Sequence, residues 1–267
     1  MNGWLCYDRL GAKKNEWFIN RLQEEAAKRG ISLTLRIVEK GDFAKTLPSN
    51  LPEFAVVRFI CPTLNEWLQE RGVRVFNNAQ TAATACDKWH TYEFQRVHGI
   101  PVLQTYRFGE GTLPFPFVAK SRFGHGGSEV FWVENEHDLQ QVRQTLQDDF
   151  LLQRPCGNLG KDMRIYAVGG KIVASVLRES DKDFRSNFSL GGRVRLAEAD
   201  ETQKSIVEKI YKALRFDFIG IDFLPDKNGW IVNELEDAAG ARMLYAVSDI
   251  DMATVMTEHI AQNIRKY

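Results

Sequence analysis

Apolar positions in the first eighty residues recur with two periods, one typical of strands and one typical of helices. The segment 14–28 carries Phe18, Leu22 and Ala26 on one helical face, and Gly30 ends it. Short apolar or alternating runs predict strands at 4–7, 32–38, 54–60 and 73–76. Because strands and helices alternate, we expect this part of the chain to form a parallel sheet with helices on both faces.

Proline, glycine and asparagine mark the remaining boundaries of this unit. Pro62 begins a second helix that ends at Gly72. The polar stretch 41–53 contains two prolines and is expected to be a loop. An Asn-Asn pair at 77–78 closes the unit, so the sequence predicts a domain boundary between this pair and Asp87.

The pattern changes after position 105, where strands predominate. Two-residue turns favour hairpins at Gly169-Gly170 and at Asn228-Gly229, each between apolar runs. Further strands are predicted at 117–120, 130–133, 150–154, 164–168 and 171–178, and helices at 87–98, 136–146, 201–214 and 249–265. The sequence therefore predicts an α/β half followed by an α+β half.

Composition excludes several classes of protein. The 267 residues are 44% hydrophobic and 26% charged, ordinary values for a globular chain of one large or two modest domains. The 35 basic residues balance the 35 acidic ones, so the chain lacks the positive charge typical of a nucleic-acid binder. No run approaches the roughly 20 apolar residues of a membrane helix. The first residues also lack the apolar core of a signal peptide, so export is not expected.

Cysteine usage indicates a reducing environment. The four cysteines, at 6, 61, 86 and 156, include no CxxC pair. A zinc site or a disulfide framework is therefore not expected. We interpret the chain as a cytoplasmic protein whose thiols are reduced and mostly buried.

A glycine-rich turn, SRFGHGGS at 121–128, lies between a strand that ends at Lys120 and one that begins at Val130. Glycines let backbone N–H groups approach phosphate oxygens, and Lys120 would add a positive charge beside them. No GK[ST] follows, so the turn is not a Walker A loop, and no helix follows, so it is not a Rossmann turn. A tight hairpin turn is the alternative explanation for the three glycines.

Three carboxylates occur on the two late strands that the second hairpin turn joins. Glu234 and Glu236 are two residues apart and point to the same face of their strand, and the hairpin can bring Asp222 alongside them. Carboxylates at such short separations repel one another unless a cation lies between them. Hard oxygen ligands favour Mg²⁺, usually shared with substrate phosphates. The alternative is the solvated outer face of an edge hairpin, although these strands are largely apolar.

Basic residues cluster between positions 161 and 195. Arg164 and Arg178 lie on neighbouring strands of the first hairpin, and the guanidinium fork matches phosphate and carboxylate groups. Most single arginines are surface charges, but the glycine turn, the lysine and the carboxylates together with them favour a phosphoryl-transfer site. The cluster comprises Lys161, Arg164, Arg178, Arg185, Arg193 and Arg195, with Asn187 near Arg185.

Taken together, these motifs resemble the ATP-grasp superfamily, and within it the RimK-like branch of glutamate-adding ligases. The stretch GKDMRIYAVGGKIVASVLRESDKDFRSNFSLGG at 160–192 matches that branch best, and DKWHTYEFQRVHGIPVLQT, FVAKSRFGHGG, IGIDFL and VNELEDAAG resemble further motifs of the branch. The resemblance implies an α/β pre-grasp domain at 1–85 and an α+β ATP-grasp domain at 86–267. The central lobe (86–153) and the C-terminal lobe (154–267) of that domain would grip ATP.

The resemblance also implies contacts to the nucleotide. Two lysines would contact the ATP phosphates, the hinge between the lobes would hold adenine, and an aspartate would lie near the ribose. The residues concerned are Lys88, Lys120, Gly124, Gly126, Gly127, Gln153, Arg154, Pro155, Asp162 and Asn187.

Metal, catalytic and substrate positions follow from the same match. Asp222, Glu234 and Glu236 match the Mg²⁺ ligands, for which Mn²⁺ is an alternative ion. The pre-grasp domain of the family usually helps to bind the acceptor. The cations implied at the transferred phosphoryl group are Lys120, Arg164 and Arg185, and those implied at the substrate are Arg178 and Arg242.

The sequence departs from the family pattern at three places. Glu236 replaces an asparagine in the usual E-x-N metal motif and adds negative charge facing ATP. The usual S-S-P-G turn reads Asp-Ala-Ala-Gly at 237–240 and is followed by Arg242, which leaves the substrate open. His125 stands in the glycine turn where a small residue is common, either facing solvent or contacting the transferred phosphoryl group.

The implied activity is a ligation that joins a carboxylate to an amine at the expense of ATP. The carboxylate attacks the γ-phosphate to give an acyl phosphate and ADP, and the amine then displaces phosphate. No nucleophilic side chain is needed, which agrees with the lack of a Ser/His/Asp or Cys/His set in the sequence. Three alternatives remain: a ligase of free amino acids rather than of a protein or peptide tail, a nucleotide-binding module without ligase activity, and, least favoured, a nucleic-acid binder. The sequence leaves open whether the protein forms a homo-oligomer.

Overall fold

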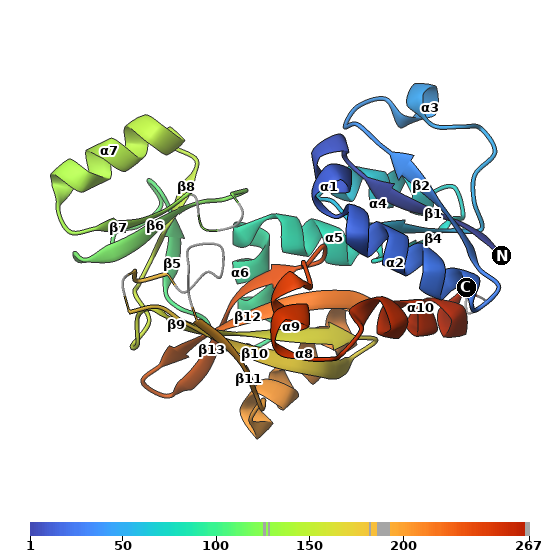
Figure 1. The fold of residues 1–267 in the computed structure, drawn as a ribbon. Coiled ribbons are helices and arrows are strands. Elements are labelled where there is room, and N and C mark those ends of the chain that lie inside the picture. The colour runs from blue at the N-terminus through green and yellow to red at the C-terminus, as the bar shows by residue number, and fades with distance from the viewer. Residues whose placement is uncertain (125–126, 128, 182, 186–192, 265–267) are drawn as a thin grey trace.

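A parallel sheet forms the N-terminal unit of the computed structural model, which describes residues 1–124, 127, 129–181, 183–185 and 193–264 (Figure 1). Its strand order is β2-β1-β3-β4, which confirms the predicted parallel sheet. The strands are β1 (Asn2–Tyr7), β2 (Ser32–Ile37), β3 (Phe54–Val57) and β4 (Arg74–Phe76). The helices are α1 (Arg9–Lys14), α2 (Glu16–Ala27), α3 (Phe43–Thr46), α4 (Pro62–Gln69) and α5 (Ala79–Cys86).

The segment predicted as one helix over 14–28 belongs to two helices, because capping side chains interrupt it. Asp8 begins α1 by accepting a hydrogen bond from the Gly11 backbone N at 2.6 Å. The Asn15 side chain donates to the Gly11 carbonyl oxygen at 2.8 Å, where α1 ends and α2 begins. Local capping, which the apolar period does not encode, therefore decides the break.

Two further helices occur where the sequence predicted none. α3 lies inside the expected loop 41–53, and α5 occupies the predicted boundary segment. Asn78 begins α5 by accepting from the Thr81 backbone N at 2.8 Å. α5 packs against α4, and its Ala and Thr residues give no strong apolar stripe, which is why its sequence carries little helical signal. The division at 85/86 stays a prediction.

An antiparallel sheet of order β5-β8-β6-β7 forms the second part of the chain. Helix α6 precedes it and α7 packs against β7. The predicted helix over 136–146 and strand over 130–133 are confirmed, whereas the short β5 was missed. The elements are α6 (Lys88–Val97), β5 (Thr105–Arg107), β6 (Phe117–Ser121), β7 (Val130–Val133), α7 (Glu136–Leu146) and β8 (Phe150–Gln153).

A second antiparallel sheet, of order β11-β10-β9-β12-β13, completes the fold. The predicted helix over 201–214 is confirmed, and β11 and the short α9 were missed. The elements are β9 (Lys161–Val168), β10 (Lys171–Glu179), β11 (Arg193–Ala197), α8 (Glu201–Leu214), β12 (Phe218–Asp226), β13 (Gly229–Glu236), α9 (Arg242–Val247) and α10 (Met252–Asn263).

Both predicted hairpins form, but the second turn is displaced by one residue. Gly169 and Gly170 have φ values of 54° and 82°, the positive angles that a tight two-residue turn needs. In the second hairpin Asp226 pairs with Gly229, so Lys227 and Asn228 make the turn in place of the predicted Asn228-Gly229. The registry is therefore set by strand pairing rather than by the Asn-Gly dipeptide.

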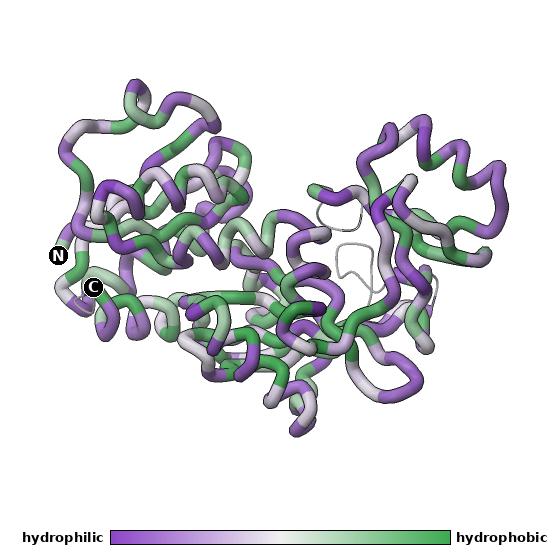
Figure 2. The backbone as a smooth tube through the Cα atoms, turned by 180° about the vertical axis from the view of Figure 1, so that it is seen from behind, coloured by the Kyte–Doolittle hydropathy of each residue, from purple (hydrophilic) through white to green (hydrophobic). Residues whose placement is uncertain are grey.

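The last sheet is covered on both faces, and this packing joins the ends of the chain. Ile165 and Ile221 pack with α8 on one face, while Tyr166 and Val168 pack with α10 and the N-terminal unit on the other. Figure 2 shows the hydrophobic segments running along the sheets and the hydrophilic ones along α7 and the outer loops. The first and the last parts of the chain therefore share one core.

Burial and cysteine pairing bear on two predictions. All four cysteines are free, but only Cys6 and Cys61 are buried, and Cys86 and Cys156 are half-buried. The prediction that the thiols are unpaired is confirmed, and the prediction that they are mostly buried holds for two of the four. Within the described residues, no helix combines the length and the apolar character needed to cross a membrane.

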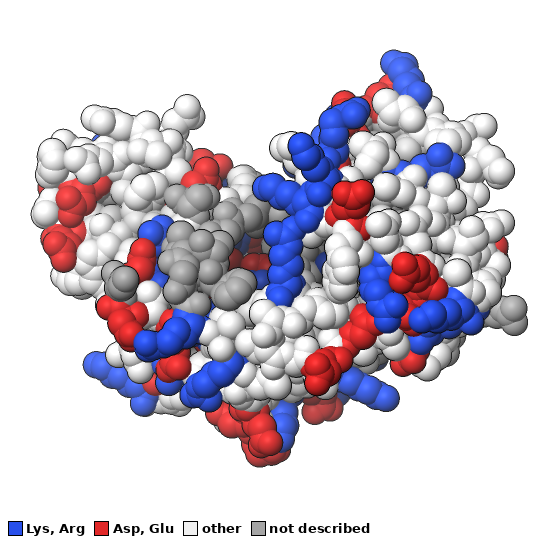
Figure 3. Space-filling model, in the orientation of Figure 1, with Lys and Arg blue, Asp and Glu red and all other residues white. Residues whose placement is uncertain are grey.

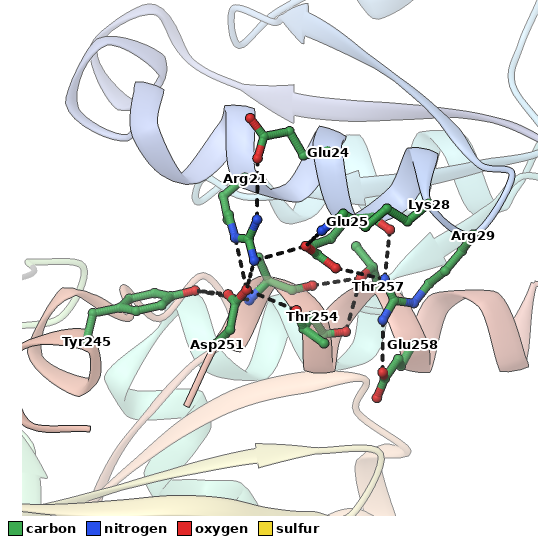
Figure 4. A network of polar contacts seen from close by, with 11 residues as sticks. Arg21, Glu24, Glu25, Lys28, Arg29, Tyr245, Asp251, Thr254, Thr257 and Glu258 are labelled. Atoms are coloured by element: carbon green, nitrogen blue, oxygen red, sulfur yellow. Dashed lines mark hydrogen bonds and ion pairs between the residues drawn. The ribbon is translucent and has the colours of Figure 1, made fainter. Parts of the chain in front are cut away.

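A network of ion pairs fastens α2 to α10 (Figure 4). Arg21 on α2 donates to the Asp251 carboxylate at 2.6 and 2.9 Å, and Arg29 donates to Glu258 at 2.8 Å. Asp251 also caps α10 and accepts from the Tyr245 hydroxyl at 2.6 Å. Burial works to raise the pKa of Asp251, but hydrogen bonds from Tyr245, Arg21 and Thr254 outweigh it and hold the pKa at about 2.

We expect Asp251→Asn to lower the free energy of unfolding by about 1–2 kcal/mol at pH 7, because the charged hydrogen bonds from Arg21 are lost while asparagine can still cap the helix. The folded-state pKa lies below the usual value, so the charge stabilises the protein above about pH 4 and its contribution disappears as the pH falls towards 2. Urea unfolding at pH 7 and near pH 2.5 would measure both effects. Asp249→Asn, at an exposed neighbouring position, serves as the control. An equal cost at both pH values would contradict the role of the charge.

Candidate functional site

A cavity of about 520 Å³ lies between the two antiparallel sheets and the N-terminal unit. Figure 3 shows the molecule hollowed there, with Lys and Arg side chains in a band along one wall and acidic atoms at the bottom. Gly126 and Asn187 of the predicted site, and His125, lie outside the described residues. The other predicted site residues line the cavity: Lys88, Lys120, Gly124, Gly127, Gln153, Arg154, Pro155, Asp162, Arg164, Arg178, Arg185, Asp222, Glu234, Glu236 and Arg242.

Five alternating charges, which we name the charge row, lie side by side in this cavity. Arg178 donates to Asp162 at 2.6 Å and to Asp222 at 2.8 Å. Arg164 binds both Asp222 oxygens at 2.7 Å and also Glu236 at 2.6 Å. The row therefore reads Asp162, Arg178, Asp222, Arg164, Glu236.

Strand registry produces this row. Asp162 and Arg164 are two residues apart on β9 and share a face, Arg178 of β10 lies opposite Asp162, and Asp222 of β12 lies opposite Arg164. Glu236 of β13 lies opposite Gly220, where a Cβ would come within 2.7 Å of the Ala239 Cβ. The glycine therefore admits the 237–240 loop beside the row.

Burial and pairing act in opposite directions on the acids of the row. Burial works to raise the pKa of Asp222, but Arg164 and Arg178 outweigh it and hold the pKa below its usual range. Glu236 pairs with Arg164, but burial and the nearby charges of Asp222 and Glu234 raise the pKa of Glu236. Asp222 is thus a fixed anion, whereas Glu236 holds its proton more tightly.

Two lysines face the row from the other lobe and α6. Lys120 is 4% exposed and donates to the Asn233 side-chain oxygen at 3.2 Å. Burial lowers the pKa of Lys120 to about 8, against the attraction of Glu234. The Lys88 Nζ lies 3.8 Å from Glu234 and donates to the Gly124 carbonyl oxygen. These cations are positioned beside the carboxylates, as a site for a polyanion requires.

The glycine turn is linked to the C-terminal lobe by Arg185. Its Nη1 donates to the Gly127 carbonyl oxygen at 2.8 Å, and its Nη2 donates to Asp183 at 2.7 Å. That bond from Arg185 lowers the pKa of Asp183. Arg185 therefore reaches across the cavity mouth to the turn that carries the predicted phosphate-binding glycines.

The hinge between the lobes is held by side chains on both sides. Gln153 donates to the Thr105 hydroxyl at 3.0 Å, so its side chain is engaged within its own lobe. Arg154 donates to both Asp226 oxygens, at 2.9 and 3.2 Å, and so fastens the hinge to the second hairpin. Backbone groups at the hinge are thereby fixed at the edge of the cavity.

The carboxylates do not form a compact metal centre by themselves. Among the described residues, no three His, Cys, Asp or Glu side chains cluster closely enough to hold a metal ion. Both Asp222 oxygens and one Glu236 oxygen accept bonds from arginines, whereas Glu234 forms an ion pair with Lys88 at 3.8 Å. The donor chemistry suits a hard cation, and Mg²⁺ needs only one or two carboxylates when phosphates supply the rest.

Part of the predicted basic cluster lies elsewhere, and other lining residues were missed. Lys161, Arg193 and Arg195 pair with acidic residues at the surface and do not line the cavity. Asn233 faces the cavity because of a bulge after Asp222, which no sequence pattern reveals. The residues that sequence reasoning missed include Lys14, Asn15, Val118, Tyr166, Leu224, Asn233 and Asp237.

Known proteins with similar sequences include a synthase and a probable ligase. Human beta-citrylglutamate synthase B is 26% identical over 252 residues, covering 84% of this chain and 65% of that protein. A probable alpha-L-glutamate ligase of Xanthomonas euvesicatoria pv. vesicatoria is 27% identical over 227 residues, covering 79% of this chain and 76% of that protein. The chain thus spans less than two thirds of the length of the human relative.

Solved structures give the same fold. A RimK domain ATP-grasp protein from Sphaerobacter thermophilus matches with a TM-score of 0.72 at 20% identity, over 99% of both chains. D-alanine–D-alanine ligase from Bacillus anthracis, complexed with ATP, matches with a TM-score of 0.75 at 15% identity, over 100% of this chain and 98% of that one. The expected ATP-grasp fold is confirmed. Since the model of the RimK-like ATP-grasp domain matches residues 101–260, the chain belongs to the RimK-like ATP-grasp family.

Proposed function

We propose that the protein is an ATP- and Mg²⁺-dependent ligase that joins a carboxylate to an amine and forms an amide bond through an acyl phosphate. The observation that carries the proposal is the convergence of Lys88 and Lys120 on Glu234, beside the Glu236 end of the charge row. Two cations opposite a group of carboxylates suit a nucleotide whose phosphates bring their own metal ion. Two relatives are named a beta-citrylglutamate synthase and a probable alpha-L-glutamate ligase, and both names agree with this chemistry.

ATP would lie across the cavity from the hinge to the charge row. Backbone groups at 153–155 would hold adenine, since the Gln153 side chain is engaged with Thr105. Asp162 would lie near the ribose. Lys88, Lys120 and the glycine turn would contact the phosphates, where ammonium groups act as point charges.

Mg²⁺ fits the carboxylates of Asp222, Glu234 and Glu236 better when phosphates are present than when it binds alone. Glu234 and Glu236 are the carboxylates with free capacity, and Asp222 would join them by sharing oxygens now bonded to Arg164 and Arg178. When bound, the ion would neutralise phosphate charge during transfer. Mn²⁺ would serve as an alternative, because it accepts the same oxygen ligands.

The reaction needs charge neutralisation more than acid–base chemistry. An oxygen of the substrate carboxylate attacks the γ-phosphorus, the bond to the bridging oxygen breaks, and ADP leaves. The amine then attacks the acyl carbon, loses a proton to water or buffer, and expels phosphate. Lys120, Arg164 and Arg185 surround the place where both anions meet and lower their repulsion.

Water must be kept from the acyl phosphate, because hydrolysis would waste ATP. The bond from Arg185 to the Gly127 carbonyl oxygen joins the glycine turn to the opposite lobe. This contact would hold the turn over the phosphates while the amine reacts.

The test is an ADP-release screen with Mg²⁺ across pairs of acids and amines, including free amino acids and peptides. We expect ADP formation to require both partners, and the product to contain one new amide bond by mass spectrometry. Tight ATP binding with no ADP release from any pair would instead support the nucleotide-binding module. That alternative is favoured by one observation, the engagement of both Asp222 oxygens by arginines.

We expect Glu234→Ala to reduce turnover by at least about 100-fold, because a ligand for the metal and phosphates is lost. The side chain is 21% exposed and lies outside the apolar cores, so the free energy of unfolding should change by less than about 1 kcal/mol. ADP release and urea unfolding measure the two effects. Glu208→Ala, on the exposed face of α8, is the control. Wild-type turnover in Glu234→Ala would reject the metal assignment.

Arg178, predicted at the substrate, is bonded to Asp162 and Asp222, and we propose that it positions these carboxylates. Arg178→Met should lower the free energy of unfolding by about 3–5 kcal/mol, since the buried Asp162 and Asp222 each lose a guanidinium partner. Arg193→Met, on neighbouring β11, removes an exposed pair and should change it by less than about 0.5 kcal/mol. Denaturant unfolding of the two variants measures both changes in the free energy of unfolding. Equal stability of the two variants would contradict the positioning role.

A further inference from the structure

Asp87 and Arg122 form an ion pair just outside the cavity, which we name the clamp. Asp87 is 2% exposed, and the Arg122 Nε donates to both oxygens of its carboxylate, at 2.8 and 3.0 Å. The Arg122 Nη2 adds a bond to Asp87 Oδ2 at 2.6 Å. Neither residue is among the described residues that line the cavity. Any contribution of the clamp to the site therefore passes through its neighbours.

Asp87 stands at the start of α6, directly before Lys88. Its Oδ1 accepts from the Trp89 backbone N at 2.9 Å, so one carboxylate both caps the helix and binds Arg122. Burial works to raise the pKa of Asp87, but the hydrogen bonds from Arg122 and from the Trp89 backbone outweigh it and hold the pKa below its usual value. Asp87 is therefore an anion that fixes the helix end from which the Lys88 side chain departs.

Arg122 stands at the start of the glycine turn, directly after β6. Its carbonyl oxygen accepts from the Lys88 backbone N at 3.1 Å, and the Gly124 carbonyl oxygen accepts from the Lys88 Nζ. The Gly124 backbone N donates to the Ser121 hydroxyl at 3.1 Å, which folds the turn back onto the end of the strand. The backbone and the side chain of Lys88 thus both bind the turn.

The clamp also relates the two walls of the cavity to each other. The glycine turn joins β6 to β7, whereas α6 packs against β13, the strand that carries Glu234 (Figure 1). The Lys88 Nζ lies 3.8 Å from Glu234. Because Arg122 binds the start of α6, it sets how far the glycine turn stands from the carboxylates of β13.

The contacts of Arg122 hold it as an anchor and not as a ligand of phosphate. Its planar fork spans both Asp87 oxygens, and its guanidinium carbon lies 5.0 Å from the centroid of the Phe123 ring. The Asp149 carboxylate lies 3.9 Å from its Nη1. Turning towards the cavity would break these contacts and leave the buried Asp87 carboxylate without its guanidinium partner, which is costly.

Resting on the proposed nucleotide site, we propose that Asp87 and Arg122 are positioning residues for the recognition of the nucleotide phosphates. They hold Lys88 and the glycine turn as one unit that faces Glu234, so that the ammonium group and the backbone N–H groups meet the phosphates together. Such a preformed arrangement lowers the cost of ordering these groups when the ligand binds. The clamp therefore affects the binding of phosphates and leaves the binding of the nucleoside at the hinge unchanged.

The test compares MgADP with adenosine, each titrated calorimetrically into the protein without acid or amine. Arg122→Gln should weaken MgADP binding by about tenfold or more, the range expected for charged hydrogen bonds that are no longer in place, and change adenosine binding by less than about twofold. A merely structural role would weaken both ligands alike. The matched control is Arg143→Gln in the same lobe, which should bind both ligands as the wild type does. Arg143 also pairs with an aspartate, Asp148 at 3.1 Å, and lies over an aromatic ring, that of Phe108.

Asp87→Asn provides a second variant, because asparagine still caps α6 and leaves no unpaired buried anion. It should weaken MgADP binding several-fold, again without an effect on adenosine. A double-mutant cycle tests the route through Lys88: in a Lys88→Gln background, Arg122→Gln should cost less than about threefold in MgADP affinity. An undiminished loss in that background, or an equal loss of MgADP and adenosine binding, would overturn the inference.

Binding and turnover separate the two proposals. MgADP binding that Arg122→Gln weakens selectively, in a protein that releases no ADP from ATP with any acid and amine, would support the clamp and reject the ligase. ADP release by a protein whose MgADP affinity is insensitive to Arg122 would reject the clamp and leave the ligase proposal standing.

Discussion

The alternation of charges across four neighbouring strands is the constraint on which the site depends. Asp222 stands between two guanidinium groups, and each of these groups also holds a second carboxylate. Taking so many charges out of water is unfavourable, and only close pairing in good geometry compensates for it. The sheet must therefore keep its registry, because a slip of one residue would turn Asp222 and Arg164 to opposite faces.

This row also orders the electrostatics of the cavity. The row contains one more acid than it has arginines, and Glu234 adds a further carboxylate beside its Glu236 end. The buried Lys120 and the neighbouring Lys88 face that negative end from the other lobe. Opposite charges on two lobes leave space between them for a ligand that carries both signs, as a nucleotide with a metal ion does.

The N-terminal unit packs directly onto the last sheet. Its sheet shares a core with α10 and the last sheet, and the ion pairs of Arg21 and Arg29 fasten α2 to α10. Asn77 adds hydrogen bonds to the backbone of Asp217 and Phe218, at 2.6 to 2.9 Å. Arg58, which directly follows β3, donates to the Ala239 carbonyl oxygen at 2.6 Å and so ties this strand end to the 237–240 loop.

The sequence by itself determined the parallel first sheet, both hairpins and most helices, because apolar periods and glycine turns are local. It also placed Asp222 beside Glu234, since strand alternation is local too. Only the tertiary structure decided that Arg164 and Arg178 bind Asp222, that Arg193 and Arg195 lie outside the cavity, and that Arg58 donates to the Ala239 carbonyl oxygen. Those relations join residues up to 181 positions apart. They depend on how sheets pack and which charges burial forces together, and neither leaves a periodic trace in the chain.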